Sequence, residues 1–366
     1  MTYSTQKRTF SLTFKIAAAL LIQCISIGTI QNSLAQSKKN IKWNMVVTES
    51  RNDHFQEILN QSLVQYVREF SNGRLTIDIS PQKSAKEPDV LKSLQSQEFQ
   101  IAHLSPASLY DSNPSLALFS STPFGMISAE RNAWLYEAGG LGLMQKAYAK
   151  YNVYAFPGGN SGIQMGGWFS KQIKSRKDIK GISIASEGIS KTVFSELGAK
   201  TVNLPAEKLV QALQNNTVEA ITGGSPATES NAEFAKIAEY YYTGWNEPSK
   251  ERQFFVEKKA YETLSKDLQL ALTSAMRLAA YDIYTYMTHL NTQKLNELKQ
   301  QYPELKIHAF PRDVMRALRR KSAQEVLSIQ KTDTEANTII RSIQAYQKQI
   351  RLWTQIGDQA YLNNSR

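Results

Sequence analysis

The stretch Ala185-Ser186-Glu187-Gly188 has the composition and the setting of an anion-binding loop. Alternating apolar residues at 182–184 predict a strand that ends at Ala185, and a helical pattern begins directly after the loop. A strand, a tight polar loop and a helix N-terminus aim backbone N–H groups and the positive end of the helix dipole at one point. We therefore expect this loop to face a small anion, although Ala185 brings no charge to hold it.

Recognisable catalytic motifs do not occur elsewhere in the chain. The four histidines, at 54, 103, 289 and 308, are too scattered to suggest a local metal motif. The sequence has no nucleophile elbow, dinucleotide fingerprint or phosphate loop, and no spacing of carboxylates singles out an acid/base pair. A binding protein is therefore the simpler interpretation. An enzyme whose catalytic residues converge from distant positions is the alternative.

The elements that must position this loop alternate between strand and helix. Residues 41–47, 75–79 and 99–104 read as strands, with amphipathic helices at 55–70 and 90–97 between them. A second series begins near Tyr154 and continues through the strand ending at Ala185 to a strand at 220–221. Helical patterns dominate after Tyr261, with one more strand at 304–310. This order predicts an α/β protein with mostly parallel sheets and helices on their faces.

The N-terminus has the pattern of an export signal. Lys7, Arg8 and Lys15 precede an apolar run at 16–30, and Ser33-Leu34-Ala35 supplies small residues for cleavage. The run is shorter than the roughly 20 residues of a membrane span, so a retained anchor is the less favoured alternative. We expect a signal peptide at 1–35 and a soluble, periplasmic product.

The mature chain is basic and without cysteine. Removing the three basic residues of the signal from a net charge of +11 leaves +8, and the only cysteine, Cys24, leaves with them. A secreted chain without disulfides must be held together by its core alone, and about 330 residues suffice for two domains. The basic residues are spread out, and the cluster at 316–321 has helical spacing, so we expect a solvated helix face and no nucleic-acid partner.

The C-terminal segment repeats apolar residues every seven positions. Ile339, Ile343, Tyr346, Ile350 and Trp353 begin the series, which continues with Gly357 and Ala360. One interpretation is a helix that lies on its own core. The other is an arm that packs on a second copy of the protein.

Four stretches resemble the solute-binding proteins of TRAP transporters, the DctP-type family. They are PFGMISAERNAWLYEAGG at 123–140, NSGIQMGGWF at 160–169, LGAKTVNLPAEKLVQALQNNTVEA at 197–220 and YYYTGWNEPS at 240–249. The last three are most similar to the branch that binds small 2-oxo or 2-hydroxy monocarboxylates with a cation. The resemblance extends from about Trp43 to Leu362.

The resemblance implies a type II periplasmic-binding-protein fold in which two lobes joined by a hinge close around a solute. We expect lobe I at 36–165 with 224–255, lobe II at 166–223 with 256–310, and a C-terminal helical segment at 311–366 as a dimerisation arm. The implied function is to deliver a small organic solute to the TRAP permease subunits, as a homodimer and without catalysis. A periplasmic sensor or adaptor that uses the same fold is the alternative.

Some binding positions of the family are kept in this chain. The resemblance implies that the solute is bound by Asn160, Gln164, Trp168, Thr222, Trp245 and Glu247. It also implies a sodium or calcium ion in the cleft, with Gln164 and Glu247 as the remaining ligands. A purely structural role is the alternative for most of these residues. Trp168 and Gln164 would then belong to the core, Trp245 would pack between the lobes, and Asn160 would form a turn.

Other binding positions of the family are replaced. Ala185 stands where relatives have the arginine that pairs with the carboxylate, and Thr222-Gly223 where they have Glu-Trp. Ala107, Ser108 and Leu109 align with tyrosines. These changes predict a weakened ion site and a larger cavity, rebuilt for another solute that is larger, neutral or amine-bearing. If an anion still binds, Arg51 and Lys191 are the candidate substitute cations, and alanine at both should then lower carboxylate affinity.

Overall fold

The computed structural model of this chain describes residues 40–48, 54–81, 87–227 and 231–365. Residues 42–366 form one compact unit, and everything below concerns that unit. The signal peptide expected at 1–35 and the candidate cation Arg51 lie outside the described residues. Within the described part, no helix has both the length and the apolar character that a membrane crossing requires.

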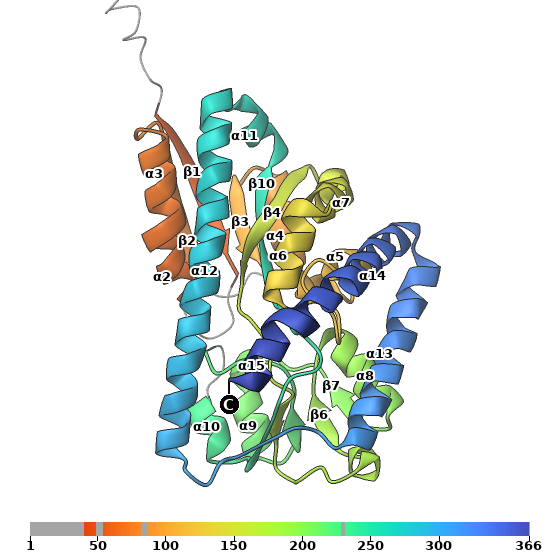
Figure 1. Cartoon of the computed structure of the whole chain (residues 1–366). Coiled ribbons are helices and arrows are strands. Elements are labelled where there is room, and N and C mark those ends of the chain that lie inside the picture. Colours follow the sequence, from red (N-terminus) through yellow and green to blue (C-terminus); the bar gives the residue numbers. More distant parts are fainter. Residues whose placement is uncertain (1–39, 49–53, 82–86, 228–230, 366) are drawn as a thin grey trace, which may run out of the picture. The chain divides into compact units, whose positions relative to one another are not determined.

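The first sheet has five strands in the order β2-β1-β3-β10-β4 (Figure 1). They are β1 (Ile41–Val47), β2 (Leu75–Pro81), β3 (Ile101–Leu104), β4 (Val153–Asn160) and β10 (Glu251–Glu257). Strands β1 and β3 pair in parallel, whereas β10 runs antiparallel to both of its neighbours, β3 and β4. Because β10 comes much later in the sequence, the chain must return to this sheet after building the second one.

The second sheet has six strands in the order β11-β9-β5-β8-β6-β7. They are β5 (Gly167–Phe169), β6 (Ser183–Ala185), β7 (Lys200–Val202), β8 (Ala220–Ile221), β9 (Tyr240–Tyr242) and β11 (Lys306–His308). Strands β6, β7 and β8 pair in parallel, and β5 runs antiparallel between β8 and β9. The predicted strand that ends at Ala185 is therefore confirmed as β6.

Two strands correct the lobe boundaries expected from the sequence. Strand β9 pairs in the second sheet, although 224–255 was assigned to lobe I. The end of β10, Val256 and Glu257, pairs with β4 in the first sheet, although 256–310 was assigned to lobe II. The local sequence of neither strand, YYY in β9 or ERQFFVE in β10, specifies which sheet it joins, because the choice of partner strand depends on residues far away in the chain.

Helices cover both sheets. They are α2 (His54–Leu59), α3 (Gln65–Phe70), α4 (Glu87–Gln95), α5 (Pro114–Ala117), α6 (Ser128–Glu137), α7 (Gly140–Tyr148), α8 (Gly188–Glu196), α9 (Leu209–Gln214), α10 (Asn231–Ala235), α11 (Lys258–Thr263), α12 (Lys266–Gln301), α13 (Arg312–Thr332), α14 (Thr334–Thr354) and α15 (Ala360–Asn364). Separate apolar cores lie against the two sheets. One centres on Phe119, Trp134 and Tyr148, and the other includes Phe169 and Phe194 on one face and Trp168 on the other.

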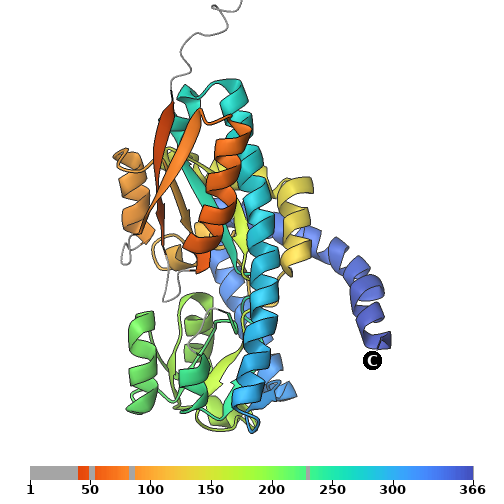
Figure 2. The same cartoon turned by 90° about the vertical axis from the view of Figure 1, so that its left-hand side faces the viewer.

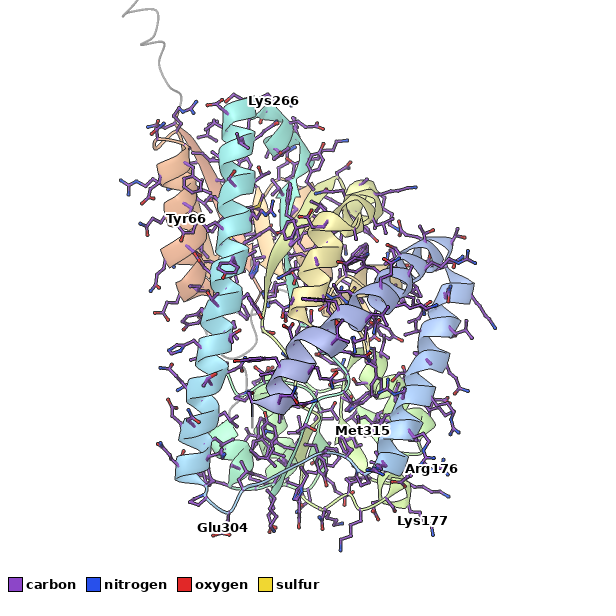
Figure 3. The ribbon with its side chains drawn as sticks, viewed as in Figure 1. Tyr66, Arg176, Lys177, Lys266, Glu304 and Met315 are labelled. Carbon is purple, nitrogen blue, oxygen red and sulfur yellow. The ribbon has the colours of Figure 1, made fainter. Side chains whose placement is uncertain are left out.

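Helix α12 connects the two halves, since it runs beside both sheets (Figures 1 and 2). At its first half, the hydroxyl of Tyr66 on α3 donates a hydrogen bond to Asp282 Oδ2 at 2.7 Å (Figure 3). Further along, Ile283 fits against Gly159 of β4, where a Cβ would come within 2.6 Å of the isoleucine methyl. At its far end, Leu298 is buried in the core of the second sheet.

Two glycines allow close approaches of the backbone, one of them at the narrow crossing between the sheets. A Cβ on Gly244 would lie 2.0 Å from the carbonyl oxygen of Gln164, and one on Gly167 would lie 2.0 Å from that of Ile221. Gly167 also has a φ of +118°, which side chains rarely tolerate. Gly244 therefore allows the segments 161–166 and 243–250 to pass each other, and Gly167 allows β5 to lie close to β8 in the second sheet.

The first half of the C-terminal segment lies on the core of its own chain, which was one of the two interpretations of its seven-residue period. Ile339 and Ile343 of α14 are buried in the core of the first sheet, where the Trp134 indole donates to Ser342 Oγ at 3.1 Å. Beyond Thr354, whose hydroxyl donates to Glu130 Oε1 at 2.6 Å, the helix continues with exposed apolar side chains. The first half is therefore core, whereas five large apolar side chains of the second half are exposed among the described residues (Leu352, Trp353, Ile356, Tyr361 and Leu362).

Candidate functional site

A small cavity lies where loops from both sheets meet. Its volume is about 80 Å³, well below the 300–1,000 Å³ typical of sites for drug-sized ligands. One wall follows β3 and includes Ala107 and Tyr110, and another follows β6 at 187–190. The third follows β8 at 222–224, with residues 246, 247 and 250 from the crossing segment. These loops follow the carboxyl ends of β3, β6 and β8, where open α/β folds bind ligands.

The loop after Ala185 faces this cavity, as the sequence suggested, but it brings a negative charge of its own. Glu187 precedes α8, and a carboxylate there is favoured by the helix dipole. The Ala185 carbonyl accepts a hydrogen bond from the backbone N–H of Thr222 at 3.0 Å, and the Thr222 hydroxyl donates to Ser186 Oγ at 2.7 Å. The loop is thereby fixed to β8.

Among the described residues that line the cavity, Lys250 is the one with a positive charge, and the sequence analysis missed it. Its Nζ lies 3.8 Å from Glu247 Oε2 and 3.9 Å from Glu187 Oε1. Burial raises the pKa of Glu247, with a smaller contribution from the charge of Glu187, while Lys250 opposes the shift. The only available signal was the position of Lys250 three residues after Glu247, in a stretch already assigned to the site.

Two further polar groups of the cavity are buried and without a partner among the described residues. Asn246 Oδ1 belongs to a side chain that is 3% exposed, and Ser121 Oγ to one that is 8% exposed. Buried polar atoms are nearly always hydrogen-bonded in folded proteins. An unsatisfied carbonyl oxygen and hydroxyl at one cavity therefore suggest that the missing partner is a bound molecule.

Of the predicted solute-binding residues, Thr222 and Glu247 line this cavity. Trp168 does not, because its ring is fully buried in β5 and stacks on Tyr241 with ring centres 4.2 Å apart. Trp245 packs edge-on against Phe194 at 5.6 Å and beside Phe124 at 5.8 Å. The positions of both tryptophans agree with the packing alternatives rather than with direct solute contact.

Gln164 and Asn160 hold the crossing segments together. The Gln164 side-chain amide donates to Ser161 Oγ and to the Gly162 carbonyl, at 3.2 and 3.1 Å. The Asn160 amide donates to Ser249 Oγ at 2.8 Å and to Glu251 Oε2 at 3.1 Å. Its carbonyl oxygen accepts from Ser128 Oγ at 2.9 Å and from the Gly162 N–H at 2.7 Å.

The replaced positions are divided between cavity and core. Ala107 and Gly223 line the cavity, and a Cβ on Gly223 would meet nothing within 4 Å, so the space of a larger side chain is open there. Leu109 is buried in the core of the first sheet instead. The Ser108 side chain lies outside the described part. Lys191 lies on α8 and does not line the cavity.

The oxygen atoms that line the cavity are a poor set of ligands for a hard cation such as calcium. Calcium prefers six to eight oxygen ligands with several carboxylates. Within the described ranges, no group of three or more His, Cys, Asp or Glu side chains could hold a metal ion. Glu247 is a candidate ligand, but the ammonium of Lys250 already lies 3.8 Å from it, and the Gln164 amide donates within its own loop.

Glu251, at the start of β10, gives the fold a pH dependence that we predict. Burial raises the pKa of this carboxyl from 4.5 to about 7, although Asn160 and Arg131 stabilise the charged form. The folded protein therefore holds the proton more tightly than the unfolded chain does. As the pH rises from 4.5 to 7, the free energy of unfolding should therefore fall, and this group should account for up to about 3 kcal/mol of the loss.

Urea unfolding at pH 5 and pH 8 tests this dependence, with Glu251→Gln as the comparison. The variant should lose less stability between the two pH values than the wild-type protein does. Equal losses in the two proteins would show that Glu251 does not bind the proton.

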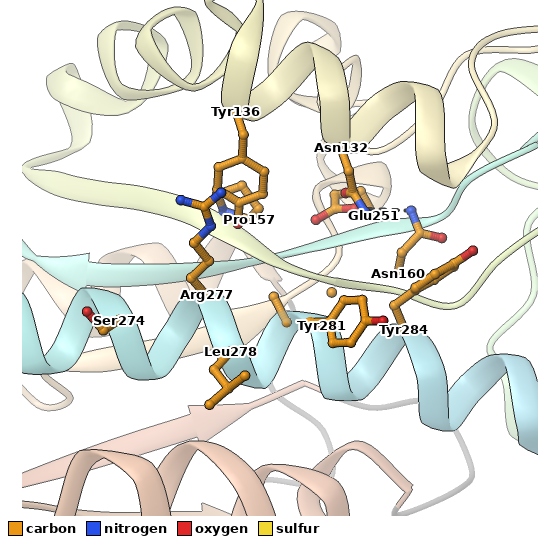
Figure 4. A pocket seen from close by; sticks show the side chains of 12 residues that line it. Asn132, Tyr136, Pro157, Asn160, Glu251, Ser274, Arg277, Leu278, Tyr281 and Tyr284 are labelled. Atoms are coloured by element: carbon orange, nitrogen blue, oxygen red, sulfur yellow. Dashed lines mark hydrogen bonds between the residues drawn. The ribbon is translucent and has the colours of Figure 1, made fainter. Parts of the chain in front are cut away.

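A second cavity, of about 510 Å³, lies between α6, β4 and α12 (Figure 4). The Arg277 guanidinium extends from α12 to the face of Tyr136 on α6, 4.4 Å from the ring centre. Leu278 and Tyr281 of α12 are exposed at this cavity. It is an open groove with aromatic side chains in its walls, and it lies beside β4 of the first sheet.

Comparison with known proteins identifies the class. The family model of the bacterial extracellular solute-binding proteins, family 7 (DctP), matches residues 45–333. The chain therefore belongs to this family of TRAP-transporter solute receptors, as its motifs suggested, and its two-lobed α/β architecture is that of the family.

Particular relatives are similar over nearly the whole chain. A TRAP periplasmic solute-binding protein from Colwellia psychrerythraea, solved with calcium and pyruvate, is 39% identical with a TM-score of 0.83, covering 89% of this chain and 100% of that one. One from Bordetella bronchiseptica, a mixed-occupancy dimer with calcium and picolinate, is 25% identical with a TM-score of 0.81, covering 89% and 97%. A monocarboxylate 2-oxoacid-binding periplasmic protein from Nostoc sp. is 29% identical over 95% and 94% of the two chains.

Proposed function

We propose that this protein is the periplasmic receptor of a TRAP-type transporter, which captures a small carboxylic acid in the 80 Å³ cavity and delivers it to the membrane permease. The observation that carries the proposal is Lys250, a cation at the meeting point of both sheets in a family of solute receptors. Pyruvate and picolinate in the relatives are acids of a size that suits this cavity.

Lys250 takes over the task of the arginine that Ala185 replaces. Its ammonium donates charge-assisted hydrogen bonds to the carboxylate of the solute. The unpartnered Ser121 hydroxyl donates to a second oxygen of the solute, and Asn246 Oδ1 accepts from a solute donor. Since the walls come from both sheets, binding holds the two lobes together around the solute.

A cation that enters with the acid would be held by Glu247 and Asn246 Oδ1. These oxygens are fewer than calcium prefers, so any ion is bound more weakly here than in the relatives solved with calcium.

Native mass spectrometry followed by calorimetry tests the proposed function. Protein purified from its own host should carry a small carboxylic acid, and calorimetry with that acid should give micromolar or tighter affinity. If well-folded protein binds no carboxylic acid in either measurement, the proposal is wrong.

The protein also forms a homodimer in this proposal, through the C-terminal arm that we define as residues 352–362. Its apolar side chains are exposed, with Trp353 at 63% and Ile356 at 74%. The 510 Å³ groove beside Leu278 and Tyr281 offers the complementary apolar surface on the same chain. Because each copy has both an arm and a groove, the arm of one copy can pack in the groove of the other, which gives a two-fold symmetric pair. The Bordetella bronchiseptica relative is a dimer.

A charge in the arm should separate the two copies. We predict that Ile356→Asp is a monomer by light scattering after gel filtration, because burying its carboxylate in an apolar interface is costly. Leu270→Asp, equally exposed on α12 but outside the groove, should leave the dimer intact. A monomeric wild-type protein, or a dimeric Ile356→Asp variant, would contradict this arrangement.

A further inference from the structure

Among the described residues that line the cavity, the ionisable groups are unbalanced. Glu187 and Glu247 bring two negative charges and Lys250 brings one positive charge. A monocarboxylate that binds to Lys250 adds a third negative charge to the same small space. The mostly buried Glu247 repels this added charge more than the exposed Glu187 does, so a solute that brings a positive group of its own is favoured over a plain anion.

A metal ion is a poor candidate for a second positive charge in this chain. The described residues contain no cluster of three acidic or imidazole side chains, and Thr222 has a hydroxyl already directed at Ser186. Gly223 brings no side chain at all. The carboxylates that remain, Glu187 and Glu247, lie close to an ammonium group rather than around an open space for an ion.

We propose that the solute itself carries the second positive charge, so that the preferred ligand is a small 2-amino acid rather than a 2-oxo acid. This rests on the proposed function and defines its substrate class. The carboxylate binds Lys250 and the ammonium binds Glu247 at the inner side of the cavity. Asn246 Oδ1, which is buried and has no partner among the described residues, accepts one of the three ammonium hydrogens.

The roles of the two glutamates follow from their positions. Glu247 is mostly buried, and burial raises its pKa, so it gains most from a cation placed beside it. Glu187 has 68% of its side chain exposed, and we therefore place it at the solvent-exposed entrance of the cavity. Beside an ionised Glu247, a 2-oxo group would place its carbonyl oxygen against a carboxylate, so that two acceptors meet without a proton between them.

The apolar part of the wall limits the side chain of the solute. It consists of small and medium groups (Ala107, Pro114, Ala117, Leu118 and Pro123). These residues suit a short aliphatic side chain, and the volume of about 80 Å³ leaves no room for a large one. Alanine and 2-aminobutyrate are therefore the amino acids to be tested.

Calorimetry with matched pairs decides between the two acid classes. The pairs are alanine with pyruvate and 2-aminobutyrate with 2-oxobutyrate, each measured in EDTA and in millimolar calcium. We expect at least one amino acid to bind about 10-fold or more tightly than its 2-oxo partner, in line with one additional charge-assisted contact. EDTA should not change its affinity, and ethylamine, which has no carboxylate, should bind far more weakly.

A matched pair of variants assigns the ammonium contact. Glu247→Gln should abolish the preference for the amino acid, while Glu297→Gln on the exposed surface of α12 should leave it unchanged. If the 2-oxo acids bind more tightly and only with calcium, the inference is overturned while the proposed function stands. If neither class binds to folded protein, the proposed function fails as well.

Discussion

Replacing Lys250 by alanine is expected to weaken the binding of any carboxylic acid by roughly 10- to 100-fold. A charge-assisted hydrogen bond contributes about 1.5–3 kcal/mol, and a decade in affinity corresponds to about 1.4 kcal/mol. The loss is at the upper end of this range because Glu187 and Glu247, 3.9 and 3.8 Å away, then face the anion without a neutralising charge. Calorimetry at constant ionic strength measures the change.

Two other lysine variants make this measurement specific. Lys250→Arg keeps the charge and should recover part of the affinity. Lys191→Ala removes a lysine from α8 that does not line the cavity, and it should bind as the wild-type protein does. A Lys250→Ala protein with full affinity, or a Lys191→Ala protein with a large loss, would mean that the carboxylate lies elsewhere.

Replacing Asn160 by alanine is expected to lower the free energy of unfolding by about 3–5 kcal/mol. The side chain is buried and uses both of its donor and acceptor groups, on Ser249, Glu251, Ser128 and the Gly162 N–H. Each neutral bond contributes about 1 kcal/mol, and buried partners that lose a bond cost further energy, most of all the Glu251 carboxylate. Urea denaturation at pH 7 measures the effect.

Asn132→Ala is the control for this loss. Asn132 is only partly buried and lines the same 510 Å³ groove as Asn160, so its removal should cost less than about 1 kcal/mol. Asn160→Ala should also keep its solute affinity at a temperature where it is folded. If instead its affinity falls while its stability does not, Asn160 contacts the solute, as the family resemblance implied.

The sequence by itself determined the class of the protein and most of its elements. Strand and helix periods are local properties, which is why the segments at 41–47, 55–70 and 75–79 appear as predicted, and why the loop after Ala185 lies between a strand and a helix. The motifs at 123–140 and 240–249 were sufficient to indicate the family. The sequence also predicted a change in the family's ligand contacts, at Ala185, Thr222 and Gly223.

Only the tertiary structure shows which side chains stand together at the cavity. Lys250 and Glu187 belong to segments far apart in the chain, and only the crossing of the two sheets brings them within 4 Å. The same holds for Asn160 and Glu251, which join two distant strands, and for β9, whose sheet no local pattern specifies. A periodic pattern reports which face of an element is buried, whereas a binding site depends on distances between elements, and those are set by packing.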